Sequence, residues 1–213
     1  MKIKQRIDNY LKNQNYTEKD IELLNSSSVY LAWQISAFAH NGQKRVNGND
    51  YFTHPCNVLQ GYRNFVGITS NGSGVDIDLL VGEFGIPYHG VQEVCLLHDV
   101  LEDTSVTLEE IEEVFEEFDL DYYFESYIKT PLLLVTHDKS EDYTIYIAKL
   151  INNPVASIVK FMDLVDNMNA STLTTFGDKE LSRINDYAFY CKCLNDRWRF
   201  TEKVYEYKKA KLT

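Results

Sequence analysis

The sequence has few of the residues that interrupt helices: among 213 residues there are only four prolines and ten glycines. Long helices are therefore easy to accommodate. No stretch is apolar over the length needed to cross a bilayer. The charged N-terminus, MKIKQRIDNYLKNQNY, also lacks the apolar segment of a signal peptide. These absences predict a protein that is neither secreted nor membrane-spanning.

Cysteine and positive charge are also scarce. The four cysteines, at positions 56, 95, 191 and 193, form no CxxC pair, so a reduced, cytoplasmic chain is the simpler interpretation. The formal net charge of −11 argues against a surface that follows the phosphates of a nucleic acid. It still allows one local basic pocket for a small phosphorylated ligand. The oligomeric state is not indicated.

Apolar residues recur at helical spacing almost throughout, which predicts an all-α bundle forming a single domain over 1–213. We expect a core over about 29–175, a helical extension over 1–25 and a C-terminal helix over about 180–209. The segment GITSNGSGVD, residues 67–76, is expected to be a loop. The other helices are expected over 21–40, 55–64, 91–101, 108–118, 121–135, 141–151 and 154–168.

The most unusual segment is HDVLED, residues 98–103, which places one histidine and three carboxylates directly after the apolar run VCLL. A buried carboxylate without a partner is costly, so this cluster needs protons, cations or a metal ion. On one continuous α-helix the four ionisable side chains project into a single sector of roughly 140°. One face of one helix is therefore expected to carry a site.

Neighbouring ligands cannot complete the coordination sphere of a metal ion, so further ligands must come from elsewhere in the chain. His54, between a loop and Pro55, is the best nitrogen donor, and Asp163, in an apolar helix, is the best oxygen donor. Together with His98 and Asp99 they form a set that suits Mn, Fe, Co or Zn better than Ca or Mg. Four protein ligands on an octahedral ion leave two positions for water and a substrate oxygen.

Three motifs occur in order along the chain: FAHNGQKRVNGNDYFTHP, HDVLEDT and VKFMDLVDNM. Together they resemble the HD-domain hydrolases of the RelA/SpoT type, including the small stand-alone alarmone hydrolases, from about Ala37 to Leu173. The resemblance implies an all-α HD domain that uses one divalent ion, usually Mn²⁺. It also implies hydrolysis of ppGpp or a related nucleotide, with the 3′-diphosphate released as pyrophosphate.

The resemblance further implies roles for individual residues. It assigns metal ligation to His54, His98, Asp99 and Asp163, handling of the attacking water to Glu102 and Asp103, and the substrate pocket to Lys44, Arg45 and Asn167. In this arrangement Arg45 packs against the purine and Asn167 contacts the ribose.

Three positions depart from the alarmone hydrolases: Val46 replaces a basic residue, Asp50 replaces a proline, and Ala170 replaces a small hydroxylated residue. These differences bear on ppGpp as the substrate more than on metal-dependent phosphate chemistry. Two alternatives follow: a phosphomonoesterase acting on another nucleotide, such as the 2′-phosphate of NADPH, or a nucleotide-sensing module without turnover. Intact Glu102 and Asp103 argue against the sensing module.

A second histidine–aspartate pair, His137 and Asp138, repeats the spacing of HDVLED in the segment HDKSED. The segment VTHDKSEDY that contains it, with DLVDNM, also resembles a set of short HD proteins. The pair leads into Lys139, so we expect it at a helix end where the lysine would repel a cation. His40 is expected on a helix face, satisfied by hydrogen bonds, with a position near the pocket as the alternative, and His89 is expected at the surface.

Overall fold

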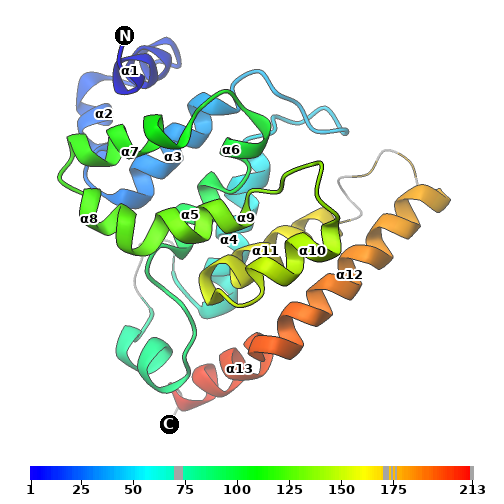
Figure 1. The fold of residues 1–213 in the computed structure, drawn as a ribbon. Coiled ribbons are helices and arrows are strands. Elements are labelled where there is room, and N and C mark those ends of the chain that lie inside the picture. The colour runs from blue at the N-terminus through cyan, green and yellow to red at the C-terminus, as the bar shows by residue number, and fades with distance from the viewer. Residues whose placement is uncertain (70–73, 170–172, 174, 176, 212–213) are drawn as a thin grey trace.

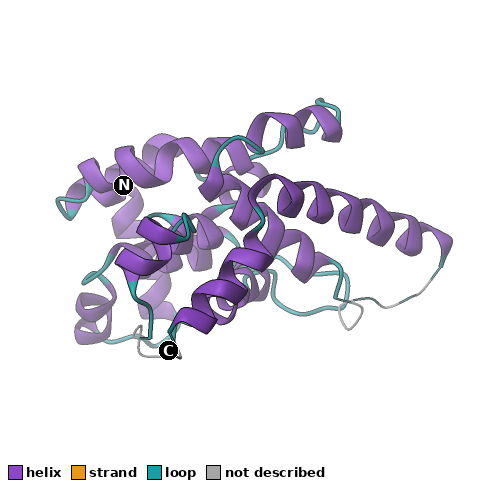
Figure 2. Ribbon diagram, turned by 90° about the horizontal axis from the view of Figure 1, so that it is seen from below, coloured by secondary structure: helices purple, strands orange, loops and turns teal. Residues whose placement is uncertain are grey.

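The computed structural model describes residues 1–69, 74–169, 173, 175 and 177–211, and the regular elements in these ranges are helices (Figures 1 and 2). The predicted all-α fold is confirmed. The described residues contain no strand beyond an isolated bridge between Lys44 and Asp50. The helices are α1 (Ile3–Asn13), α2 (Glu18–Leu24), α3 (Ser28–Ala39), α4 (Thr53–Val66), α5 (Val91–Leu97), α6 (Val100–Asp103), α7 (Leu108–Glu117), α8 (Asp121–Tyr123), α9 (Lys129–Val135), α10 (Tyr143–Leu150), α11 (Pro154–Asn167), α12 (Asp178–Trp198) and α13 (Phe200–Ala210), with π-helical turns η1 (Asp78–Glu83) and η2 (Phe124–Ile128).

Helices α4, α5 and α11 pack against one another at the centre of the bundle, with α3 beside α5 and the long α12 beside α11 (Figure 1). Buried side chains from Ile3 in α1 to Tyr207 in α13 form one core cluster. Most side chains of α5 are buried, as expected for a central helix. Polar residues on α11 and directly after α5 are therefore held inside the bundle. None of the helices in the described ranges is both long and apolar enough to cross a membrane.

The predicted helix from Ile21 to His40 is wrong, because two helices occupy this range. Helix α2 ends at Leu24, and the polar residues Asn25, Ser26 and Ser27 separate it from α3. The Ser27 side chain accepts a hydrogen bond from the Tyr30 N–H and caps α3. Serine and asparagine favour caps and turns because their side chains compete for backbone hydrogen bonds.

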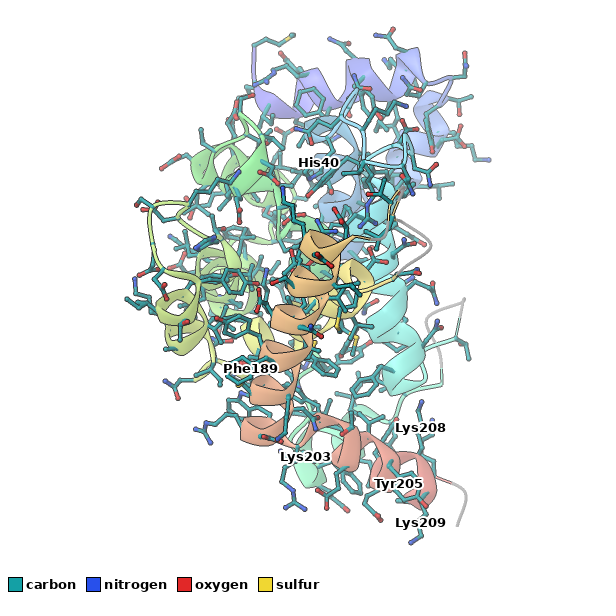
Figure 3. All side chains as sticks on the ribbon, turned by 90° about the vertical axis from the view of Figure 1, so that its right-hand side faces the viewer. His40, Phe189, Lys203, Tyr205, Lys208 and Lys209 are labelled. Carbon is teal, nitrogen blue, oxygen red and sulfur yellow. The ribbon has the colours of Figure 1, made fainter. Side chains whose placement is uncertain are left out.

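The predicted helix over 180–209 is also two helices. Arg199 adopts a left-handed conformation, with φ of 56°, so the chain turns between α12 and α13. Helix α13 then packs beside α4. Figure 3 shows Lys203, Tyr205, Lys208 and Lys209 together at this C-terminal end. The helices predicted over 55–64, 108–118, 141–151 and 154–168 are confirmed as α4, α7, α10 and α11, and 121–135 is helical as α8, η2 and α9 in succession.

Glu93 in α5 is a buried acid, with 2% of its surface exposed. Burial raises its pKa, and the hydrogen bond from the Ser28 hydroxyl only partly opposes this. The folded protein therefore holds this proton more tightly than the unfolded chain. The contribution of Glu93 to stability is present below its unfolded pKa of about 4.5, and it is lost as pH rises through the raised folded value.

Glu93→Gln removes this ionisation. We expect the variant to be more stable than the parent protein at pH 8, by about 1 kcal/mol, with a smaller difference at pH 5. Urea unfolding at both pH values, in the presence of EDTA to exclude metal binding, measures the change. An equal difference at the two pH values would show that Glu93 does not titrate in this range.

Candidate metal centre

Two buried histidines face each other between α4 and the end of α5. His54 Nδ1 lies 2.7 Å from Asp166 Oδ2, and His98 Nδ1 lies 2.9 Å from the Cys95 carbonyl oxygen. Both of these partners are acceptors, so each ring carries a proton on Nδ1 and directs Nε2 toward the other ring. The two Nε2 atoms are 3.3 Å apart. Nitrogen lone pairs at this distance require a proton or a cation between them.

Asp163 and Asp99 bring carboxylate oxygens to the same point. Asp163 Oδ1 lies 3.0 Å from His54 Nε2 and 3.6 Å from His98 Nε2. Asp99 Oδ2 lies 3.5 and 3.2 Å from the same two nitrogens. Neighbouring donors on one ion, each about 2.1 Å from it, are separated by about 3.0 Å. The buried His54, His98 and Asp163 can hold a metal ion, and Asp99 reaches both imidazoles from a less buried position.

The electrostatics of this centre favour a cation. Burial alone would lower the pKa of His98, but the Asp99 and Asp163 carboxylates outweigh it and raise that pKa. Burial would also lower the pKa of His54, but its hydrogen bonds to Asp163 and Asp166 outweigh this, so the pKa of His54 is raised as well. The carboxylates thus create a negative potential at the two Nε2 atoms, and a divalent ion satisfies it directly.

HDVLED is not one continuous helix. Helix α5 ends at Leu97 and α6 begins at Val100, so His98 and Asp99 lie at the junction between them. The prediction that one helical face carries the cluster is therefore wrong. Adjacent residues on an α-helix diverge by about 100°, which would separate the two side chains. At the junction, where Asp99 has φ −96° and ψ −6°, both side chains reach the same centre.

Glu102 and Asp103 follow on α6, beside the centre. Glu102 Oε2 accepts a hydrogen bond of 3.0 Å from the His137 backbone N–H, and burial is the main cause that raises the pKa of Glu102. Asp103 Oδ1 lies 2.7 Å from Lys139 Nζ. An acid whose pKa is raised toward neutrality is suited to proton transfer.

Tyr51 links the His98–Asp99 pair of HDVLED to the Glu102–Asp103 pair. Its hydroxyl donates to Asp99 Oδ2 at 2.7 Å and lies 3.3 Å from Asp103 Oδ2. A single phenol therefore fixes the orientation of both carboxylates. A role for Tyr51 was not predicted from the sequence, although its place three residues before His54 in the motif NDYFTHP puts it on the same turn.

Arg45 and Asn167, which were predicted in the substrate pocket, lie at the edge of the centre and line the cavity beside it. Arg45 Nη1 forms a 2.8 Å ion pair with Asp166 Oδ2, and Arg45 Nη2 lies 3.4 Å from Asn167 Oδ1. Asn167 also donates to Asp163 Oδ1 at 2.6 Å. Lys44 is different: it is exposed and paired with Asp50.

A cavity of about 420 Å³ opens beside His54 and Tyr51. Its walls come from the loop before α4, from the end of α11 and from the first turns of α12: Lys44, Arg45, Val46, Tyr51, His54, Asn167, Leu173, Thr175, Lys179, Glu180, Arg183 and Tyr187. Four of these residues are cations, so the cavity is a local basic site in a chain of net charge −11. Phosphate groups are the natural ligands of such a site.

The chain is similar in sequence or fold to two known proteins. No family model matches the chain. The chain is 27% identical over 173 residues to the guanosine-3′,5′-bis(diphosphate) 3′-pyrophosphohydrolase of Aquifex aeolicus (strain VF5), an alignment that covers 78% of this chain and 22% of that protein. It thus spans about a fifth of the length of this relative. A solved structure of a metazoan ortholog of SpoT, described as hydrolysing ppGpp and playing a role in starvation responses, matches with a TM-score of 0.52. It is 24% identical, and the match covers 87% of this chain and 96% of that one. The chain has the fold of a SpoT-like HD hydrolase.

Within this HD fold, several residues near the centre were not found from the sequence. Lys179, Arg183 and Tyr187 line the cavity from α12, and their spacing of four residues is the signal of one helical face. Asp166 accepts from both His54 and Arg45, and its place three residues after Asp163 put it on the same side of α11.

Lys160 is a further buried partner in the HD fold. Its Nζ lies 2.7 Å from Asp163 Oδ2. The same nitrogen lies 5.6 and 5.4 Å from the ring centroids of Tyr143 and Tyr146, within the range of a cation–π contact. Burial would lower the pKa of Lys160, but the Asp163 carboxylate outweighs it and raises the pKa. Lys160 therefore pairs with Asp163 Oδ2 and leaves Oδ1, which faces the histidines, for the metal ion.

The remaining histidines of the HD fold are not among the donors that meet at the centre, although the His40 ring packs against Tyr51, with 4.9 Å between ring centroids. His40 is buried at the C-terminal end of α3, with Nδ1 2.8 Å from Gln43 Oε1. Its Nε2 has no hydrogen-bond partner among the described residues, so the expectation that hydrogen bonds satisfy it is only half correct. His89 is exposed, as predicted. The His137 ring lies 3.0 Å from the Glu141 carbonyl oxygen. Ala170, a departure from the alarmone hydrolases, lies outside the described residues.

Proposed function

We propose that this protein is a metal-dependent phosphohydrolase that removes the 3′-diphosphate from ppGpp or a related nucleotide as pyrophosphate. The observation that carries the proposal is the position of the His54, His98, Asp99 and Asp163 donors between a basic cavity and the Glu102–Asp103 pair. The similarity to the two ppGpp-hydrolysing proteins supports the choice of nucleotide.

The nucleoside occupies the basic cavity in this proposal. A volume of about 420 Å³ lies within the usual range for small-molecule sites. Arg45 has its guanidinium fixed by Asp166 and Asn167, so its planar face is available for stacking on a base. Lys179 and Arg183 on the opposite wall are placed to bind the 5′-phosphates. Their charges replace the basic residue that is absent at Val46.

We propose Mn²⁺ as the ion, with Fe, Co or Zn as competitors for the same nitrogen and oxygen donors. A divalent ion in this set neutralises a phosphoryl oxygen and lowers the pKa of a water molecule. The four cysteines are free thiols, which supports the proposed cytoplasmic location.

The chain's own residues complete the reaction. The cavity is lined by Tyr51 and His54 but by neither Glu102 nor Asp103, although the Tyr51 hydroxyl also contacts Asp103. We propose that the nucleoside leaves toward the cavity while Glu102 acts on the water at the other face of the attacked phosphorus. This suits in-line displacement. Glu102 takes the proton from water, the water oxygen bonds to phosphorus, and the bond from phosphorus to the 3′-oxygen breaks. The 3′-oxygen takes up a proton, and pyrophosphate carries away the water oxygen.

A product-release assay over a nucleotide panel tests the function. The protein is incubated with Mn²⁺ and with ppGpp, pppGpp or NADPH, and pyrophosphate and orthophosphate are measured separately. We expect pyrophosphate from the first two substrates. Orthophosphate from NADPH alone would identify a phosphomonoesterase instead, and nucleotide binding without either product would identify a sensing module.

Arg45→Ala tests the base contact. Because stacking stabilises the bound substrate and the transition state alike, we expect KM to rise by about 10-fold while kcat changes less. Steady-state kinetics with a purine and a pyrimidine substrate measure the effect, and Lys192→Ala, which removes an exposed charge that does not line the cavity, is the control. If the parent enzyme has equal kcat/KM for purine and pyrimidine substrates, Arg45 does not recognise the base.

A further inference from the structure

The loop between α9 and α10, residues 136–142, carries the second histidine–aspartate pair and lies against α6. The His137 N–H donates to Glu102 Oε2 at 3.0 Å, and the His137 ring binds the Glu141 carbonyl oxygen at 3.0 Å. The N–H and hydroxyl of Ser140 both donate to Asp138 Oδ1, at 2.9 and 2.8 Å. The loop is therefore a folded structure with a fixed position relative to Glu102.

This loop presents one cation to the site. Lys139 Nζ lies 2.7 Å from Asp103 Oδ1, and 67% of the Lys139 side chain is exposed. The hydrogen bond and charge of Asp103 raise the pKa of Lys139, with smaller contributions from Glu102 and Asp99. The ammonium group thus faces the acidic side of the centre while it stays open to an incoming ligand.

A phosphorylated substrate needs positive charge on this side. Its phosphates approach Glu102 and Asp103, and those like charges repel them. The cations of the cavity lie beside His54 and Tyr51, and the cavity is lined by none of Glu102, Asp103 and Lys139. Lys160 is buried and already paired with Asp163 Oδ2. Lys139 is exposed, so it can turn from Asp103 to a phosphate while its ammonium group stays at the surface.

We propose that Lys139 binds the outer phosphate of the substrate's diphosphate, so that the loop 136–142 distinguishes a diphosphate from a monophosphate. The inference rests on the proposed function. In the displacement described above, the attacked phosphorus lies at the centre and the nucleoside lies in the cavity. The outer phosphate is bonded to that phosphorus through an equatorial oxygen, to one side of the line from the attacking water to the 3′-oxygen, and in this proposal it lies against Lys139. A monophosphate has no group that reaches the lysine.

Anion binding to the Mn²⁺-loaded protein tests the subsite without turnover. We compare Lys139→Gln with Lys149→Gln, which removes an exposed lysine paired with Glu141 at the far end of the same loop. Calorimetry with pyrophosphate and with orthophosphate gives both dissociation constants. We expect Lys139→Gln to weaken the binding of pyrophosphate about 10-fold or more, which is the scale of one charged hydrogen bond. The binding of orthophosphate should weaken less than about 2-fold. Lys149→Gln should change neither.

Kinetics give a second measure. The ratio of kcat/KM for ppGpp to that for the corresponding 3′-monophosphate should fall about 10-fold in Lys139→Gln, and Lys139→Arg should restore most of it. Equal weakening of both anions, no weakening, or loss of bound metal would overturn the proposal. If the parent protein hydrolyses none of these nucleotides, the proposed function fails, and the pyrophosphate measurement still decides the role of Lys139.

Discussion

Glu102→Gln is expected to lower kcat by about 10²-fold or more while bound metal and substrate affinity stay unchanged. Glutamine keeps the size of the side chain and can still accept the hydrogen bond from the His137 N–H, but it cannot take a proton from water. The carboxylate is not among the four donors that meet at the centre, so its loss leaves the metal site intact. Steady-state kinetics and elemental analysis of the same preparation measure both effects.

A matched comparison is Glu109→Gln, an exposed acid on the next helix. It removes the same negative charge away from the centre and should leave kcat unchanged. A Glu102→Gln enzyme that remains fully active, or one that has lost its metal, would contradict the separation between the metal-binding and proton-accepting residues.

Asp163→Ala is expected to remove most of the bound metal, which we expect at about one ion per chain, and to lower activity by at least about 10²-fold. Asp163 Oδ1 contacts both imidazoles, so the substitution removes a buried oxygen ligand that lies between the two histidines. The substitution also leaves Lys160 as a buried cation without its partner, which destabilises the fold. His98→Ala, which leaves that ion pair in place, should give the same loss of metal and activity.

Elemental analysis, with thermal unfolding to confirm folding, measures these variants. His137→Ala is the matched control because the second histidine–aspartate pair faces the Glu141 carbonyl oxygen and not the centre. It should keep its metal. Full metal content in both Asp163→Ala and His98→Ala would remove these residues from the ligand set. Loss of metal in His137→Ala would show that the ion binds at the second histidine–aspartate pair instead.

The residues of the centre could be found from the sequence because each is a polar exception in an apolar context. His98 and Asp99 follow VCLL, and Asp163 interrupts the apolar run of α11. Their convergence with His54 could be expected from the need to neutralise a buried charge cluster. Local geometry could not be found in this way. The helix break at His98 and Asp99 depends on how α5 ends against α4 and α11, which is a tertiary effect.

The residues that were missed act through partners distant in sequence. Tyr51 contacts Asp99 and Asp103 across about fifty positions, and Lys139 reaches Asp103 across 36. Neither residue is unusual in its own segment: a tyrosine in a loop and a lysine after a helix are common. Their roles follow only when α4, α6 and the loop after α9 are placed side by side.

Asp166 accepts from both Arg45 Nη1 and His54 Nδ1 through the same oxygen, at 2.8 and 2.7 Å. The two donors compete for that oxygen's electron density, so a nucleotide that changes the Arg45–Asp166 ion pair also changes the hydrogen bond from His54 to Asp166 and, through it, the donor strength of His54 Nε2. Occupancy of the cavity and occupancy of the metal centre are then thermodynamically coupled. By linkage, the factor by which bound nucleotide changes the affinity for the ion equals the factor by which the bound ion changes the affinity for the nucleotide.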